Sequence, residues 1–208
     1  MIGLVDIGLG NLGSLEQAVY SQGWDPVRLQ QPDQLNSEVS HLILPGVGAF
    51  FEASQRLQQS GWLQALQAFA AGGRPLMGIC LGMQLLASEG DEGGKSVGLG
   101  LIPGRVKRLD CGPDLRIPHV GWNEVHFTQG QGHPMLGNIA NDVDFYFVHS
   151  YQFLVDSPEH ALATTPYGQH FNSIVARGNV IGLQFHPEKS QTNGLRLLDN
   201  FCLWDGQC

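Results

Sequence analysis

Apolar and polar positions follow two different patterns along this chain. In residues 1–90, short apolar runs alternate with stretches in which apolar residues recur every three or four positions. Short apolar runs predict buried strands, and the longer spacing predicts amphipathic helices. Strands that alternate with helices favour a parallel sheet covered by helices. The predicted strands are 2–5, 27–29, 41–44 and 75–79, and the predicted helices are 14–22, 50–59, 62–71 and 81–88.

The second half of the chain is richer in predicted strands and turns. No linker, internal repeat or low-complexity segment separates the two halves, so we expect a single domain over 1–208. The glycine-rich segment 90–94 is expected to be an exposed loop. The fold class expected is α/β, with a mixed, mostly parallel sheet flanked by helices and a β-rich second half. Further strands are predicted at 104–109, 123–127, 144–149, 160–165, 173–177 and 180–185, followed by a helix at 192–203.

A cysteine lies at the predicted junction between a strand and a helix. Segment 78–82 reads Gly-Ile-Cys-Leu-Gly, which is the nucleophile-elbow pattern with sulfur in place of oxygen. Glycines are needed where the strand and the helix cross closely. The turn exposes the sulfur, and a helix N-terminus favours thiolate over thiol. Cys80 is therefore the candidate nucleophile, and a small buried apolar residue is the alternative interpretation.

A histidine and a carboxylate follow the last predicted strand, as His186, Pro187 and Glu188. In extended backbone, side chains at i and i+2 share a face, and Pro187 is expected to keep His186 extended. His186 can then take the proton of a thiol and deliver it to a leaving amine. Glu188 would fix the imidazole tautomer and stabilise the imidazolium. A surface turn without a catalytic role is the alternative.

The first predicted strand is followed by a glycine-rich turn. Segment 8–13, Gly-Leu-Gly-Asn-Leu-Gly, matches the dinucleotide fingerprint between a strand and a helix. That fingerprint also needs an acidic residue at the end of the second strand, whereas Gln30 and Gln31 follow 27–29. A tight strand-to-helix turn is therefore favoured over a nucleotide site.

Composition argues against some classes of binding partner and predicts a cellular location. A net charge of -8 over 208 residues argues against nucleic acid or an anionic membrane as the main partner. The N-terminal stretch has no basic segment and contains Asp6, so it does not resemble a signal peptide, and no apolar run is long enough to span a membrane. The cysteines lack the spacing of a disulfide framework or a zinc site, which predicts a reducing, cytoplasmic location without a metal; they are Cys80, Cys111, Cys202 and Cys208.

The cysteine and histidine segments together resemble a known enzyme family. Gly-Ile-Cys-Leu-Gly-Met-Gln at 78–84 and Gln-Phe-His-Pro-Glu-Lys-Ser at 184–190 are similar to the triad-type (class I) glutamine amidotransferases. Segments 5–12, 44–50, 117–123 and 146–151 resemble, within that family, the glutaminase subunits of imidazole glycerol phosphate synthase. The chain departs from the pattern at Ile7, where tyrosine is expected. It also departs at Gln152-Phe153, directly after His149-Ser150-Tyr151, where a second aromatic residue is commoner.

The resemblance implies a flavodoxin-like fold and hydrolysis of L-glutamine through a cysteine thioester, with no metal or organic cofactor. Amide hydrolysis also needs backbone N–H groups that stabilise the tetrahedral oxyanion. The N–H of Leu81, next after the nucleophile, is the natural first donor, and the resemblance implies Val47 or Gly48 as the second. It further implies glutamine contacts, which are Gly46, Gln84, Ser150 and Tyr151.

The resemblance also implies a partner. In this family the ammonia passes through a tunnel to a cyclase subunit with a (β/α)8 barrel, in a heterodimer that serves histidine biosynthesis. Asn11, Trp122 and Lys189 belong to motifs near the mouth of the site and are the candidate partner contacts.

Three other functions stay open from the sequence. One is a glutaminase subunit of another synthase, of the anthranilate or pyridoxal phosphate type, and segment 118–123 argues against it. The second is a dinucleotide-binding oxidoreductase. The third is an inactive interaction module, against which the intact Cys80, His186 and Glu188 argue.

Overall fold

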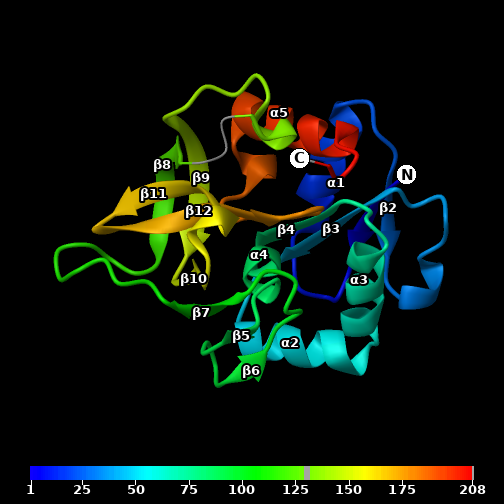
Figure 1. The fold of residues 1–208 in the computed structure, drawn as a ribbon, viewed down its shortest axis with the longest axis horizontal. Coiled ribbons are helices and arrows are strands. Elements are labelled where there is room, and N and C mark those ends of the chain that lie inside the picture. The colour runs from blue at the N-terminus through cyan, green and yellow to red at the C-terminus, as the bar shows by residue number, and fades with distance from the viewer. Residues whose placement is uncertain (129–131, 208) are drawn as a thin grey trace.

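The computed structural model describes residues 1–128 and 132–207, so Cys208 lies outside the described residues. A nine-stranded sheet runs through the molecule in the order β2-β1-β3-β4-β13-β12-β11-β8-β9 (Figure 1). Its strands are β1 (Ile2–Val5), β2 (Pro26–Leu29), β3 (His41–Gly46), β4 (Leu76–Cys80), β8 (His119–Phe127), β9 (Val143–His149), β11 (Ala161–Tyr167), β12 (Gln169–Arg177) and β13 (Val180–Leu183).

The sheet has a parallel half and an antiparallel half. Strands from β2 to β13 in the sheet order pair in parallel. From β13 to β9 every neighbouring pair is antiparallel. The α/β fold with a mixed sheet is confirmed, although parallel pairs do not dominate it as predicted. The parallel half contains Cys80 at the carboxyl end of β4, where sheets of this kind bind ligands.

Helices cover both faces of the parallel half, and each face has its own apolar core. In Figure 1, α1 (Leu12–Ser21) and α5 (Gln191–Leu203) lie together on one side of the sheet, with α2 (Phe50–Gln59), α3 (Trp62–Ala71) and α4 (Leu81–Leu85) on the other. Alternate residues of β3 enter the two cores, with Ile43 in one and Leu42 and Leu44 in the other. This alternation explains why a strand buried on both faces reads as a continuous apolar run.

A second, four-stranded sheet packs below the first, in the order β10-β7-β5-β6. It consists of β5 (Glu89–Gly90), β6 (Ser96–Val97), β7 (Gly104–Arg108) and β10 (Tyr151–Val155). Val106 and Phe153 are fully buried in the core that also holds Leu81 and Leu86. The sequence predicted β7 but missed β10, which connects this sheet to the end of β9.

Several predicted elements differ from the structure. The helix predicted at 81–88 ends at Leu85, and the strand predicted at 180–185 ends at Leu183. In the loop predicted at 90–94, Gly90 is buried in β5 while most of the segment is exposed. Short 3-10 helices were also missed, each beginning at a proline, whose fixed φ suits the first position of a helix: Pro32–Gln34, Pro134–Leu136, Pro158–His160 and Pro187–Lys189. Over the described residues, no helix combines the length and apolar character needed to cross a bilayer.

Candidate active site

Cys80 occupies a strained turn between β4 and α4. Its φ is 54° and its ψ is -109°, a backbone conformation that side chains with a Cβ rarely adopt. The flanking glycines allow the crossing, because a Cβ on Gly78 would lie 2.5 Å from the Gly82 carbonyl oxygen. A Cβ on Gly82 would lie 1.7 Å from the Leu44 carbonyl oxygen. The glycines on both sides of Cys80 are therefore required by packing. Because α4 is only five residues long, its dipole favours a thiolate less than the longer predicted helix would.

His186 and Glu188 form a buried pair beside the turn. The imidazole Nδ1 lies 2.9 Å from Glu188 Oε1, and the two side chains are only 4% and 6% exposed. The backbone at His186 is extended, as predicted, but a 3-10 helix begins at Pro187, so the predicted extended geometry from His186 to Glu188 was wrong. The tight turn still brings the carboxylate to the ring. Since a carboxylate accepts, Nδ1 carries a proton, and Nε2 has no hydrogen-bond partner among the described residues.

The environment of His186 favours its charged form. Burial opposes the imidazolium, but Cys80 and Glu188 outweigh it and raise the pKa of His186 to about 9. At neutral pH the proton therefore resides on the imidazole. Cys80 Sγ lies 3.7 Å from the Val148 carbonyl oxygen and 3.9 Å from Gln184 Nε2.

A cleft of about 300 Å³ opens in front of Cys80. It brings together most of the residues predicted from the sequence, from both halves of the sheet. Gly46 does not line it; it pairs with Cys80 in the parallel register of β3 and β4 and borders a second cavity. Its role as a glutamine contact stays a prediction. The cleft is lined by Val47, Gly48, Cys80, Leu81, Gln84, Glu92, Pro118, Val148, His149, Ser150 and Tyr151.

Two residues of this region were missed in the sequence. Glu92 lines the cleft, and its Oε2 accepts from the backbone N–H of Phe50 at 3.1 Å. Burial raises the pKa of Glu92, and the Phe50 N–H opposes that shift. Gln184 is fully buried and connects Cys80 to Gln84. Glu92 had no signal in the sequence, because it lies in a predicted exposed loop. Gln184 belongs to the segment 184–190 that carries the family resemblance, but it was read only as part of a predicted strand.

The Gln84 side chain is held in one orientation. Its Nε2 lies 3.1 Å from the Tyr151 carbonyl oxygen and 3.1 Å from Gln184 Oε1. A carbonyl can only accept, so the atom of Gln84 that faces Tyr151 must be nitrogen. Gln84 can therefore offer its amide oxygen to a ligand in the cleft.

The predicted catalytic residues His186 and Glu188 do not line this cleft but a separate small cavity of about 20 Å³. His186 and Glu188 line it together with Asn11 and Lys189, two of the candidate partner contacts. The third, Trp122, is 47% exposed and meets the ring of Tyr146, over which Lys189 Nζ also lies at 5.8 Å.

The two departures from the family pattern lie outside the cleft. Ile7 is half-buried against the core on the side of α2, and Gln152 pairs with Lys107 in the second sheet. In the glycine-rich turn, the carbonyl oxygens of Ile7 and Gly8 accept from Arg56. Within 1–128 and 132–207, no three His, Cys, Asp or Glu residues are grouped to hold a metal ion.

Comparisons with known proteins agree with this geometry. Residues 4–204 match the family model described as glutamine amidotransferase class-I. The chain is 46% identical, over 98% of its length and 94% of the relative, to "Imidazole glycerol phosphate synthase subunit HisH" of Desulfitobacterium hafniense. It is 46% identical to the protein of the same name in Symbiobacterium thermophilum, over 95% of this chain and 91% of that one. A solved structure titled as a glutamine amidotransferase has the same fold, with a TM-score of 0.73 at 20% identity over 99% of this chain and 98% of that one.

Proposed function

We propose, from the premise that the chain belongs to the class-I glutamine amidotransferase family, that it is the glutaminase subunit of an imidazole glycerol phosphate synthase. It would hydrolyse L-glutamine to glutamate and ammonia and supply the ammonia to a cyclase subunit in histidine biosynthesis. The observation that carries the proposal is the strained Cys80 in a cleft, together with a buried His186 that Cys80 and Glu188 keep charged.

His186 accepts the proton of Cys80 before glutamine is attacked, so Cys80 enters the reaction as a thiolate. The thiolate attacks the side-chain carboxamide carbon of glutamine, and the carbonyl oxygen becomes an oxyanion. The N–H of Leu81 and an N–H of Val47 or Gly48 stabilise this oxyanion, since all three residues line the cleft. His186 protonates the nitrogen of the tetrahedral intermediate as the C–N bond breaks, so neutral ammonia departs and a γ-glutamyl thioester remains on Cys80. Water, activated by His186, then releases glutamate and restores the thiol.

The cleft offers complementary groups for the amino-acid end of glutamine. The amide oxygen of Gln84 and the carboxylate of Glu92 are acceptors for an α-ammonium group. Ser150 and Tyr151 follow β9 and supply contacts from the opposite wall. A substrate bound between these walls would place its carboxamide at Cys80.

The small cavity behind His186 is the proposed exit for ammonia. It is lined by His186, which protonates the leaving group, and by the candidate partner contacts Asn11 and Lys189. Ammonia released into bulk water at neutral pH would become ammonium and lose its nucleophilicity. A cyclase with a (β/α)8 barrel, docked as a heterodimer over Asn11, Trp122 and Lys189, would receive it directly. A cytoplasmic location suits the catalytic thiol, and the described cysteines are all free.

The test is glutamate release from glutamine by the purified chain alone, with the cyclase, and with the cyclase plus its nucleotide substrate. We expect little activity alone and a large rise with the liganded cyclase. Cys80→Ala should abolish turnover and labelling by a glutamine-analogue electrophile. Cys202→Ala is the matched control, because burial and then Asp199 raise the pKa of that thiol to about 12.

Two outcomes would contradict the proposal. High activity alone, with no response to the cyclase, would assign the chain to a different synthase. No activity in any arm would leave an interaction module. Truncating Asn11, Trp122 and Lys189 one at a time should weaken complex formation or activation, and unchanged behaviour of all three would refute the proposed interface.

A further inference from the structure

We infer that His119 and His149 are positioning residues of the glutamine cleft. A chain of hydrogen bonds through their rings holds the Tyr151 carbonyl, and through it the amide of Gln84. This inference rests on the proposed glutaminase function, since it explains how one wall of that cleft is kept in place.

The two histidines lie opposite each other in the register of β8 and β9. They form the inner end of the chain of hydrogen bonds. His149 Nδ1 is 2.8 Å from the Tyr151 carbonyl oxygen, which also accepts from Gln84 Nε2. His149 Nε2 is 3.0 Å from His119 Nδ1. Both side chains are buried, at 5% and 3% exposed. His149 itself lines the cleft, so this wall is held by a ring at its surface and a second ring, His119, behind it.

The chemistry of the partners fixes every proton in this chain. The Tyr151 carbonyl only accepts, so His149 must be protonated on Nδ1 and must accept through Nε2. His119 must then donate through Nδ1 and accept through Nε2. A second proton on either ring would sit on Nε2, which is the atom that must accept a hydrogen bond from the next residue. The arrangement therefore requires two neutral histidines with the same tautomer.

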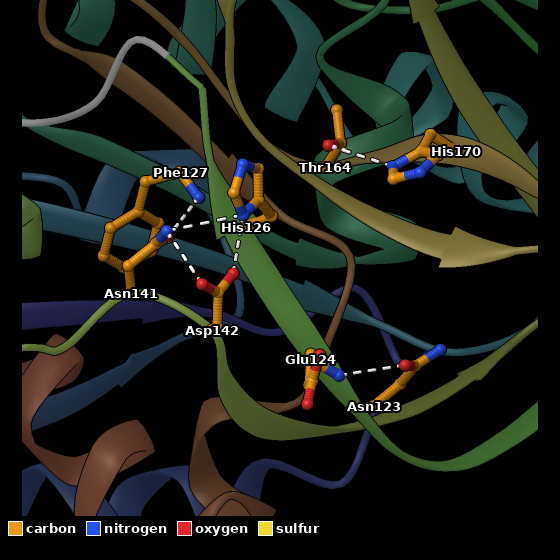
Figure 2. A network of polar contacts seen from close by, with 8 residues as sticks. All are labelled: Asn123, Glu124, His126, Phe127, Asn141, Asp142, Thr164 and His170. Atoms are coloured by element: carbon orange, nitrogen blue, oxygen red, sulfur yellow. Dashed lines mark hydrogen bonds and ion pairs between the residues drawn. The ribbon is translucent and has the colours of Figure 1, made fainter.

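The chain of hydrogen bonds ends, on its outer side, at the side-chain amide of Asn123. Asn123 Nδ2 lies 3.3 Å from His119 Nε2 and 2.8 Å from the Pro166 carbonyl oxygen. Figure 2 shows the Asn123 amide oxygen turned to the backbone N–H of Glu124, which donates to it at 2.9 Å. The next histidine along β8, His126, is instead exposed and pairs with Asp142. Only the histidines on the inward face can therefore act on the cleft.

The surroundings suit neutral rings. The ring centroid of His119 lies 5.0 Å from that of Phe147, on which it stacks, and 4.0 Å from that of Tyr167. The ring centroid of His149 lies 4.8 Å from that of Phe171. Burial lowers the pKa of His119 to about 4. For His149, burial is again the main cause, opposed by the Tyr151 carbonyl and aided by His119 and His186, and its pKa falls to about 3.

The kinetic test uses the complex with the cyclase and its nucleotide substrate. His149→Phe removes both ring nitrogens at similar volume, and we expect KM for glutamine to rise roughly tenfold while kcat falls less than about threefold. His149→Asn keeps a donor near the position of Nδ1, so it should recover most of the KM. The control His170→Asn changes an exposed histidine on β12 and should match the unaltered protein.

Three results would overturn the inference: an unchanged KM in His149→Phe, equal losses in the Phe and Asn variants, or a fall in kcat alone. If His149→Phe fails to fold, His119→Asn, which keeps the donor toward His149, and His119→Leu, which removes it, give the same comparison. The histidine tautomers supply a readout besides activity, because ¹⁵N NMR of the unaltered chain should show both rings neutral and protonated on Nδ1. The opposite tautomer would refute the chain of hydrogen bonds, whereas absence of glutamate release by the unaltered complex would refute the proposed function.

Discussion

His186 and His149 are both buried, and both donate from Nδ1 to an oxygen, yet one ring is charged and the other is neutral. His186 faces the Glu188 carboxylate and has a pKa raised to about 9. His149 faces the Tyr151 carbonyl and has a pKa lowered to about 3. Both sites fix a tautomer, but only His186 has Cys80 and a carboxylate beside it to offset the desolvation of an imidazolium. Cys80 and the type of oxygen on Nδ1 therefore distinguish the histidine proposed to transfer protons from the one proposed to hold a wall in place.

The largest effect that sharpens this comparison is expected from His186→Asn. The variant loses the group that exchanges protons with Cys80 and with ammonia, so kcat should fall by roughly a thousandfold or more. KM for glutamine should change little, because the lining of the cleft is retained. Steady-state glutamate release by the complex measures both constants. A variant that kept a tenth of the wild-type kcat would remove His186 from the reaction.

Glu188→Gln should have the next largest effect, because it replaces the charged acceptor by a neutral one. We expect kcat to fall roughly a hundredfold or more. The alkaline limb of the pH profile, expected near pH 9 from the His186 pKa, should move to lower pH, because Glu188 is one of the two groups that raise it. Rates measured from about pH 6 to about pH 10 test this shift.

A second His–Glu pair serves as the control for that variant. Glu159 Oε1 lies 4.0 Å from His160 Nε2, and its side chain is 75% exposed. Glu159→Gln should leave both kcat and the alkaline limb unchanged. If it moved the limb as far as Glu188→Gln does, the shift would reflect overall charge and not the buried pair.

The two sites should also contribute to stability with opposite dependence on pH. The contribution of His186 is complete below its unfolded pKa of 6.5 and is lost as the pH rises through about 9. The contribution of the neutral pair is complete above 6.5 and is lost as the pH falls toward 4 and 3. For each buried histidine that stays neutral, the free energy of unfolding of the protein should fall by about 2 kcal/mol between about pH 6.5 and about pH 5.

Urea unfolding at a series of pH values measures these slopes. His149→Asn should flatten the acid side of the profile, and Glu188→Gln should weaken the loss on the alkaline side. Equal acid slopes in His149→Asn and the unaltered protein would mean that the pair does not stay neutral in the folded state.

The smallest effect is expected at the outer end of the chain of hydrogen bonds. Asn123→Ala removes the donor to His119 Nε2, but Asn123 is only half-buried, so water can take its place. KM for glutamine should rise no more than about threefold, and the Nδ1 tautomers should persist in the NMR spectrum. An effect as large as that of His149→Phe would show that the chain is controlled from its outer end.

The parallel half of the fold was more predictable than the antiparallel half. The helices α2 and α3 were predicted with the bounds that the structure has, because their apolar residues follow the helical period closely. The nucleophile turn was also readable, since its glycines are imposed by close packing within a few residues. Local spacing was enough in both cases.

The support behind the cleft could not be read from the sequence in the same way. His119 and His149 are 30 residues apart and meet only through the register of β8 and β9. That register depends on pairing between distant segments, which no local pattern specifies. Likewise, β10 was missed because Tyr151–Val155 pairs with β7 far along the chain, and the turn at Pro187 was read as extended.

The backbone conformation of Cys80 lowers the stability of the protein at the residue proposed as its nucleophile. A residue with a Cβ held at φ 54° stores conformational strain that glycine would not. Cys80→Gly should therefore relax the turn, although it also gives up the contacts of the sulfur. The proposed role of Cys80 as the nucleophile accounts for a conformation that folding alone would not favour. In a library of random variants selected only for thermal stability, we expect Cys80 to be replaced early.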